Sequence, residues 1–130
     1  EVSGEQMVII KPEEEKRNRQ ALFIHQFLVD FHKRSPEIPV YVAGDLNDDP
    51  WSDTLAILSN DLLVNLNQLI PENERYSYIL DGNAIQLDHI LVTENSDWQE
   101  SFQIMHLNTS LDHSKQISDH DAVIAEITIP

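Results

Sequence analysis

Two segments of the chain are apolar on both faces of an expected strand, and they restrict the fold more than any other feature. Ile38 to Ala43 is a continuous apolar run, and Asp121 to Ile129 has apolar residues that point to both sides. A strand buried on both faces needs one packing layer above the sheet and another below it. The chain offers a long helix for the first layer and little for the second, so the pattern indicates half of a layered sandwich.

The remaining pattern predicts one domain, residues 1–130, with a long helix followed mostly by strands. Apolar residues recur at helical spacing from Ala21 to Phe31, which predicts a helix from an acidic first turn at 13–15 to about Lys33. Asp81-Gly82-Asn83 is a hairpin signal between strands at 76–80 and 86–93. The other expected elements are a helix at 53–60, an ambiguous segment at 62–70, and strands at Met7 to Ile10, 102–108 and 121–129. This order predicts an α/β fold of the α+β type, a mainly antiparallel sheet with helices on one face.

The chain is strongly acidic, with 8 Lys and Arg against 23 Asp and Glu and a net charge of −15. Broad nucleic-acid-binding surfaces contact the phosphates through Lys and Arg. The charge balance argues against such a surface built from this chain alone, so a polyanionic substrate needs bound cations or a basic surface supplied elsewhere. The absence of cysteine excludes disulfides and thiolate chemistry. Charged residues interrupt every long apolar stretch, so no membrane segment is expected.

Three polar clusters lie at the ends or in the middle of the apolar strands. One directly follows a strand, one is embedded in a strand, and one directly precedes a strand. In this order the clusters are Gly44-Asp45-Leu46-Asn47, Leu87-Asp88-His89-Ile90 and Ser118-Asp119-His120.

Each cluster also has a structural interpretation that involves no chemistry. Asp-x-Asn after a strand is common in turns, because both residues cap and tolerate unusual dihedral angles. A carboxylate inside an apolar strand needs a partner, since an unpaired buried charge is costly, but a structural partner would suffice. Ser-Asp-His-Asp can be an ordinary loop. We interpret the acidic positions 48, 49, 53 and 121 as solvated loop charges or helix caps, and we expect structural or surface positions for His25, His32, His106 and His113.

Together, the three clusters resemble the C-terminal motifs of the endonuclease/exonuclease/phosphatase (deoxyribonuclease I-like) superfamily. They occur in the family's order, each next to the right kind of strand, and the match spans Met7 to Ile129. The resemblance implies half of a four-layer α/β/β/α sandwich and metal-dependent hydrolysis of phosphodiester bonds. Tyr76-Ser77-Tyr78, Gln86 to Ile90 and His106 to Asn108 are similar to the branch of bacterial extracellular nucleases. This similarity favours a DNA endonuclease that acts outside the cell or in the cell envelope.

By this resemblance, five residues carry the site. His120 contacts the phosphate and transfers a proton, while Asp88 holds its imidazole. Asp45 orients the attacking water, and Asn47 donates a hydrogen bond to a phosphate oxygen or to Asp45. Asp119 binds a divalent cation directly or through water, and oxygen ligands favour magnesium, manganese or calcium over zinc. We therefore expect the five side chains to converge.

The family's N-terminal half has no counterpart in these 130 residues. By the same resemblance, that half supplies a metal-binding Glu, an Asn near the phosphate and a further His or Tyr. A single Asp leaves an oxygen-seeking cation far short of its roughly six ligands. We therefore expect this chain to be a fragment that is inactive alone and pairs with the missing half.

Two other functions stay open at this point. Relatives of the same fold cleave phospholipids or inositol phosphates, and the loops that select the substrate lie largely in the missing half. Alternatively, the chain is a non-catalytic acidic interaction module that binds a partner, or a second copy of itself as a homodimer, through an exposed sheet face. Large exposed apolar patches mark such interaction sites.

Overall fold

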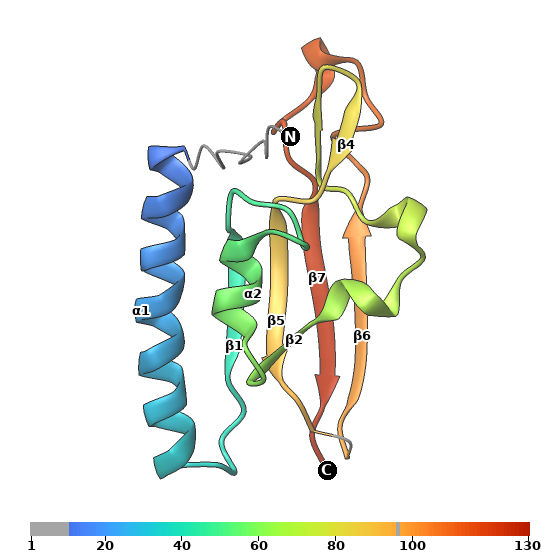
Figure 1. The fold of residues 1–130 in the computed structure, drawn as a ribbon. Helices are drawn as coiled ribbons and strands as arrows, with labels where there is room; N and C mark the ends of the chain where they lie inside the picture. The colour runs from blue at the N-terminus through green and yellow to red at the C-terminus, as the bar shows by residue number, and fades with distance from the viewer. Residues whose placement is uncertain (1–10, 96) are drawn as a thin grey trace, which may run out of the picture.

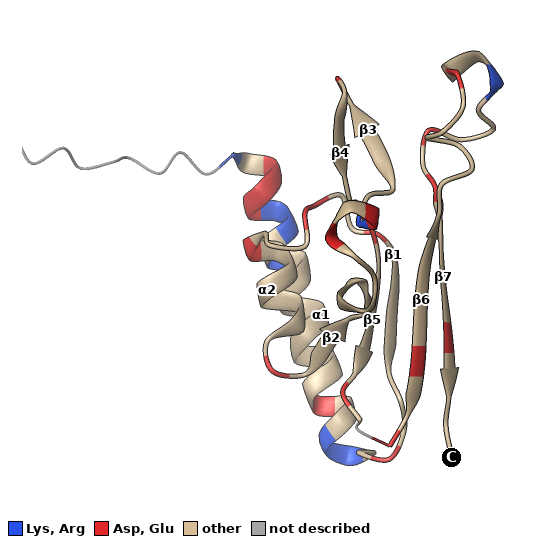
Figure 2. Cartoon of the chain, turned by 90° about the vertical axis from the view of Figure 1, so that its right-hand side faces the viewer, with Lys and Arg blue, Asp and Glu red and all other residues tan. Residues whose placement is uncertain are grey.

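The fold consists of a helical layer, a central sheet and a two-stranded ribbon, stacked in that order (Figure 1 and Figure 2). The computed structural model describes residues 11–95 and 97–130, so the strand predicted at Met7 to Ile10 lies outside the described residues. The predicted α/β fold with antiparallel pairing and helices on one side is confirmed. None of the described helices combines the length and the apolarity that a membrane crossing requires.

The helical layer contains α1 (Pro12–Arg34) and α2 (Asp53–Ser59). Proline at the first position of α1 and three glutamates in its first turn both favour a helix N-terminus. The side chain of Ser52 caps α2 by accepting a hydrogen bond from the Leu55 amide. Both helices therefore begin where the sequence predicts them.

The central sheet contains three antiparallel strands in the order β1-β5-β2, with β1 at Tyr41–Asp45, β5 at Asp88–Thr93 and β2 at Leu63–Asn65. Its helix-facing side forms one core with residues Ala21, Leu28, Leu55, Leu58, Leu63 and Leu91. The register places Asp45 directly opposite Asp88. Two of the motif carboxylates therefore lie side by side at one end of the sheet.

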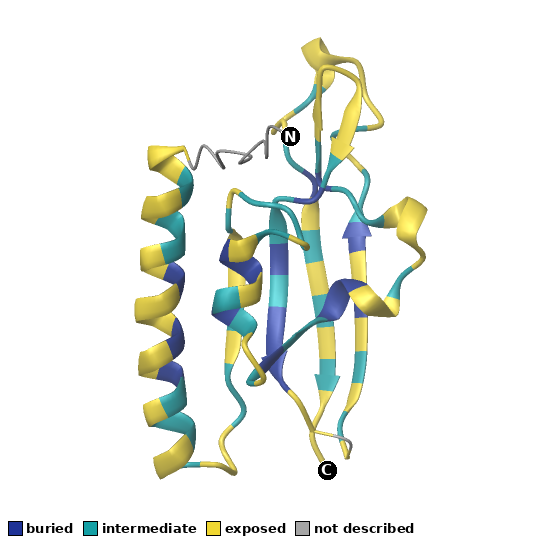
Figure 3. Cartoon of the chain, in the orientation of Figure 1, coloured by how far each residue is buried: buried dark blue, intermediate teal, exposed yellow. Residues whose placement is uncertain are grey.

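The second layer is larger than the sequence predicts. Strands β6 (Gln99–Met105) and β7 (Ala122–Thr128) form an antiparallel ribbon that packs on β5 and covers part of the other side of the central sheet. A second core of Leu66, Val92, Phe102 and Ile104 fills the space between them. Alternate residues of β7 are exposed, as Figure 3 shows, so the ribbon still presents one outer face. The ribbon thus supplies a partial second layer, and exposed Tyr41 and Ile124 leave apolar surface on the sheet and on the ribbon, as expected for half of a layered sandwich.

The predicted hairpin forms, but with a different second strand. β3 (Tyr78–Leu80) pairs with β4 (Asn83–Ile85), and the turn residues Asp81 and Gly82 adopt φ values of 49° and 80°. The strand predicted at 86–93 instead begins at Asp88 as β5 and pairs with β1 and β2. The chain turns away between β4 and β5, so the hairpin projects beyond the end of the central sheet (Figure 1).

Candidate active site

His120 and Asp88 are in direct hydrogen-bonding contact, although they are far apart in sequence. The imidazole Nδ1 lies 2.6 Å from the Asp88 Oδ2. The contact joins the first residue of β5 to the segment that leads into β7. When Nδ1 donates to the carboxylate, Nε2 is left for a substrate, and no residue within 11–95 or 97–130 hydrogen-bonds that nitrogen. This geometry suits a histidine that exchanges a proton at Nε2.

Ser77 and Tyr78, at the start of the hairpin, surround this pair. Ser77 is fully buried, and its hydroxyl donates to Asp88 Oδ2 at 2.6 Å. The Tyr78 ring lies against the His120 ring, with centroids 4.8 Å apart and planes tilted by 35°. Neither residue has a role that the sequence alone predicts. The only signal in the sequence was the likeness of Tyr76-Ser77-Tyr78 to one branch of the superfamily.

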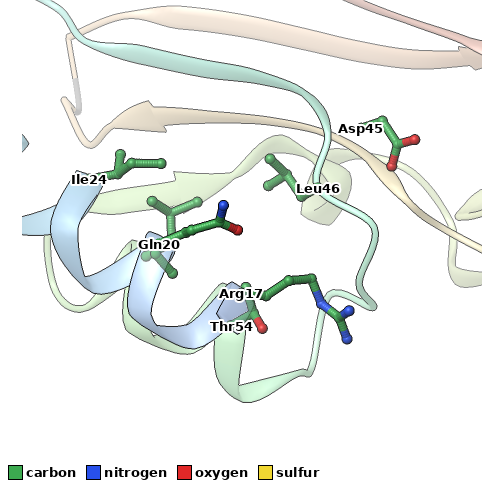
Figure 4. A pocket seen from close by; sticks show the side chains of 8 residues that line it. Arg17, Gln20, Ile24, Asp45, Leu46 and Thr54 are labelled. Carbon is green, nitrogen blue, oxygen red and sulfur yellow. The ribbon is translucent and has the colours of Figure 1, made fainter. Parts of the chain in front are cut away.

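Asp45 is the last residue of β1 and is held by the turn that follows it. The backbone amide of Asn47 donates to Asp45 Oδ1 at 2.8 Å, and Asn47 adopts a positive φ of 53°. The turn interpretation of Asp-x-Asn is therefore correct for the backbone, while the Asn47 side chain stays exposed. Figure 4 shows the Asp45 carboxylate pointing away from Leu46 and from the α1 side chains.

Gly44 adopts a φ of +147°, which L-residues rarely adopt, so a side chain at this position should strain the backbone. A Cβ at this position would have no atom within 4 Å, so the cost of Gly44→Ala is backbone strain and not a clash. We expect the free energy of unfolding to fall by about 1–3 kcal/mol, measured by urea denaturation. Gly82→Asn is the control, since asparagine tolerates the φ of +80° found there. Equal stabilities of Gly44→Ala and the wild type would contradict this reading of β1.

Three of the five predicted side chains form one cluster. Ligand atoms of Asp45, Asp88 and His120 all lie within 4.8 Å of one another. Asn47 adjoins them through its bond to Asp45. Asp119 is exposed and lies outside this cluster, where it lines a hollow between β3 and the loop that contains Thr109 and Gln116. The structure therefore brings together the aspartate pair and the imidazole, and leaves Asp119 at their margin.

The acidic surroundings favour the protonated ring of His120. Burial alone would lower the pKa of His120, but the hydrogen bond and charge of Asp88, with the charges of Asp45 and Asp119, raise it above its ordinary value of 6.5. A raised pKa in the folded state means that the protonated ring stabilises the fold. This contribution is complete below about pH 6.5 and is lost as the pH rises through the folded-state pKa.

We expect an NMR titration of the imidazole resonances to give His120 a pKa above 6.5 in the wild-type chain. Asp88→Asn removes the largest attraction and should lower the pKa of His120. Asp112→Asn serves as a matched control, because Asp112 is exposed and its carboxylate pairs with Lys115. An unchanged His120 titration in Asp88→Asn would show that the carboxylate does not act on the ring.

His89, next to Asp88, supports the site from the opposite side of β5. Its ring is fully buried, Nε2 lies 2.9 Å from the Asp48 carbonyl oxygen, and Nδ1 lies 3.0 Å from Asn65 Nδ2. Burial lowers the pKa of His89 below 6.5, so its ring is neutral and donates from Nε2 to the carbonyl. The ring thereby holds the loop that follows Asp45 onto the sheet.

Two acidic residues that the sequence analysis treated as solvated charges are structural anchors. The Asp48 carboxylate accepts hydrogen bonds from Arg17 at 3.0 Å and from the Thr54 hydroxyl at 2.7 Å. Asp121 is buried. Its carboxylate accepts hydrogen bonds from the backbone amides of Asn108 and Thr109, from the Thr109 hydroxyl and from the His106 ring. The solvated interpretation is wrong for both, because neighbouring donors replace water around each charge.

Positive charge is scarce around the cluster. Six of the eight Lys and Arg residues lie between Lys11 and Arg34, and Figure 2 shows them at the two ends of α1. In the described part of the chain, no Lys or Arg pairs with Asp45, Asp88 or Asp119. The hollow in Figure 4, between α1 and the end of β1, is lined by Arg17, but this guanidinium is engaged by Asp48. Among the described residues, no Lys or Arg side chain therefore compensates the clustered carboxylates, and His120 is their one cationic partner when its ring is protonated.

A profile of the endonuclease/exonuclease/phosphatase family matches residues 8–120, which include Asp45, Asp88 and His120. The chain belongs to this family. The resemblance inferred from the three motifs is therefore confirmed. A comparison with curated proteins gives no match.

Solved structures of other proteins show that the fold is the one expected for a member of this family. A mannosyl-6-phosphatase, Bt3783 of Bacteroides thetaiotaomicron VPI-5482, is 19% identical with a TM-score of 0.63, and the match covers 88% of this chain and 46% of that protein. Truncated Caenorhabditis elegans TDP2 is 15% identical with a TM-score of 0.68, over 89% of this chain and 49% of TDP2. A family protein of Bacteroides vulgatus is 20% identical with a TM-score of 0.66, over 90% and 45%. The chain thus spans about half the length of the structures that it matches.

The clustered residues fit part of a divalent-metal site, as the family's chemistry implies. Asp45 uses Oδ1 for the Asn47 amide, and Asp88 uses Oδ2 for Ser77 and His120. The second oxygen of each of these two carboxylates has no hydrogen-bond partner among the described residues and is left for a cation. Carboxylate oxygens suit magnesium, manganese or calcium, but they fall short of the six or more ligands that such ions require. This member of the family holds an incomplete ligand set within the described residues.

Proposed function

We propose that this chain carries the proton-transfer part of a metal-dependent hydrolase that cleaves phosphodiester bonds, with DNA as the substrate. The contact of 2.6 Å between His120 and Asp88, with Asp45 in the same cluster, is the observation that carries the proposal. Phosphodiester hydrolysis needs an activated water, stabilisation of charge on the phosphoryl oxygens and protonation of the leaving oxygen. The cluster supplies groups for the first and last of these needs.

In this proposal, His120 transfers a proton and Asp45 positions the attacking water. Asp88 holds the imidazole in the tautomer with hydrogen on Nδ1, so Nε2 meets the phosphate and transfers a proton. Asp45, whose orientation is fixed by the Asn47 amide, positions the attacking water. The exposed Asn47 side chain donates to a phosphate oxygen. The surrounding carboxylates favour the protonated imidazole, which suits contact with an anionic phosphate.

The proposal assigns Asp119 to a divalent cation, with magnesium preferred. A bound cation would stabilise charge on the phosphoryl oxygens and offset the repulsion between the substrate and a chain of net charge −15. Asp119 is exposed and one residue from His120, so its carboxylate can approach a metal held at the margin of the cluster. The scarcity of Lys and Arg near the site makes this cation, or a basic partner surface, necessary for a polyanionic substrate.

We also propose that a second half completes the site and that the chain alone is inactive. The support is the partial ligand set and the fact that the chain matches only 45–49% of three similar structures. Exposed Tyr41 and Ile124, on the central sheet and on the ribbon, offer apolar surface for that half. A reading frame that continues upstream for about 120 residues, with an Asn and later a Glu, is the expected genetic arrangement. A homodimer in light scattering of the chain, with the site idle, would instead favour an interaction module.

A phosphomonoesterase is the second candidate, because one structure of the same fold is a mannosyl-6-phosphatase. The test compares supercoiled plasmid DNA, a sugar phosphate and sphingomyelin vesicles in Mg²⁺ or Mn²⁺, with the chain alone and with the protein from the extended reading frame. The proposal expects cleavage of DNA by the extended protein and none by the chain alone. Preferential hydrolysis of the sugar phosphate or of the lipid would overturn the substrate assignment. Turnover that His120→Ala does not change would overturn the assignment of the site.

A further inference from the structure

We infer that Ser77 is a positioning residue for the Asp88–His120 pair, because its hydroxyl fixes the rotation of the Asp88 carboxylate toward the imidazole. The consequence for hydrolysis rests on the proposed function. The geometry of the three residues is independent of the substrate.

The hydrogen-bond partners of the Ser77 hydroxyl determine which way its proton points. Oγ accepts from the backbone amides of Leu87 and Asp88, each at 3.1 Å. A serine hydroxyl has two acceptor positions and one proton, so the proton is left to donate to Asp88 Oδ2 at 2.6 Å. The hydroxyl therefore binds both the backbone and the side chain of Asp88.

The backbone of Ser77 is fixed on both sides. Its amide donates to the Ile85 carbonyl at 3.0 Å, which ties it to β4. Its carbonyl accepts from the Asp121 amide at 2.8 Å, which ties it to the residue after His120. Ser77 is also completely excluded from solvent. One residue thus connects the hairpin, the start of β5 and the segment that carries His120.

The carboxylate of Asp88 needs such a constraint, because the terminal torsion of aspartate has a broad energy minimum. Oδ2 accepts two short hydrogen bonds, from Ser77 and from His120, both at 2.6 Å. Two donors from different directions define the rotation of the group, and charge-assisted bonds of this length are strong. Tyr78, the next residue, packs against the imidazole and restricts the second partner of the pair. Ser77 and Tyr78 together hold the pair in place before a substrate binds.

The test uses the 130-residue chain without metal or substrate and observes the imidazole proton on His120 Nδ1 by NMR. A short hydrogen bond to a carboxylate places this proton far downfield and protects it from exchange with water, and its loss in His120→Gln assigns it. Ser77→Ala is expected to broaden the resonance or remove it, because the freed carboxylate no longer faces Nδ1 continuously. Ser77→Thr, which keeps the hydroxyl, should restore it. If the alanine variant does not fold, Ser77→Cys, with a weaker donor of similar shape, should give an intermediate result.

Thr54→Ala is the matched control, since the buried Thr54 hydroxyl donates to another carboxylate, that of Asp48, at 2.7 Å. It should leave the His120 resonance sharp while lowering stability. A sharp, unshifted resonance in folded Ser77→Ala would overturn the inference. A sharp resonance that moves further downfield in Ser77→Ala would also overturn it, because Ser77 would then compete with His120 for the Asp88 carboxylate and would not position it.

The hydrolysis assay separates this inference from the proposed function. In the form that cleaves DNA, Ser77→Ala should reduce kcat by about tenfold to a hundredfold with little change in KM, as expected for residues that orient a reacting group. If no phosphodiester is cleaved by any form but the NMR result holds, the proposed function fails and the positioning role stands. If DNA is cleaved and Ser77→Ala is unaffected in both assays, the positioning role fails alone.

Discussion

Replacing His120 by alanine is expected to reduce DNA cleavage by about a hundredfold to ten-thousandfold, the usual contribution of a positioned acid or base. The imidazole is the only group in the cluster of Asp45, Asp88 and His120 that can both donate and accept a proton near neutral pH. The loss should appear in kcat more than in KM, since the change removes a group that acts in the transition state. The measurement is initial-rate cleavage of supercoiled plasmid with Mg²⁺, in the form of the protein that cleaves it.

His113→Ala is the matched control for this experiment. His113 is exposed, its Nδ1 lies 3.2 Å from Gln116 Oε1 in the loop before β7, and it is not a member of the cluster of Asp45, Asp88 and His120. It should retain nearly full activity. Equal losses in His113→Ala and His120→Ala would indicate general damage to the loop and would remove the support for proton transfer by His120.

Asp121→Asn is expected to have the largest effect on stability, a loss of about 3 kcal/mol in the free energy of unfolding at pH 7. Asp121 is 2% exposed, and its carboxylate accepts hydrogen bonds from Asn108, Thr109 and His106. The amide of asparagine keeps the shape but brings a donor where donors already converge. Urea denaturation of the two proteins measures the difference, and Asp112→Asn, at an exposed position, should change stability by less than about 0.5 kcal/mol.

The effect of Asp121→Asn should depend on pH in a defined direction. Burial alone would raise the pKa of Asp121, but the hydrogen bonds from Thr109, His106 and Asn108 lower it below the ordinary value of 3.8. The stabilisation is therefore complete above about pH 4 and is lost as the pH falls through the folded-state pKa. The difference between wild type and Asp121→Asn should shrink in acid. A difference that grows in acid would contradict this assignment.

The contact between Asp88 and His120 was expected because the three motifs together resemble the family, in which the aspartate holds the imidazole; the strand pattern alone left each motif open to a structural interpretation. The same reasoning could not find Ser77. The hydrogen bonds of Ser77 depend on where the hairpin ends. The alternation of apolar and polar residues alone would allow strand 76–80 to pair with either 83–85 or 86–93. The turn at Asp81 and Gly82 favours the nearer partner, β4, and this choice brings Ser77 next to Asp88.

Asp121 and the ribbon show a second limit of sequence patterns. In the sequence, Asp121 looks like one more acidic residue of a polar loop. It can be buried only because the amides of Asn108 and Thr109, in the segment after β6, donate hydrogen bonds to its carboxylate. The pairing of β6 with β7 likewise decides that the chain covers part of its own sheet. Long-range pairing of this kind is not encoded in local periodicity. The helices, whose caps and spacing are local, were predicted closely.

A double-mutant cycle on DNA cleavage tests most directly whether Asp88 acts through His120. The cycle compares wild type, Asp88→Asn, His120→Gln and the double variant under the same Mg²⁺ concentration. The 2.6 Å contact predicts that the double variant cleaves no more slowly than His120→Gln alone, because the carboxylate has nothing to position once the imidazole is gone. Losses that multiply in the double variant would show two independent roles and would contradict the account.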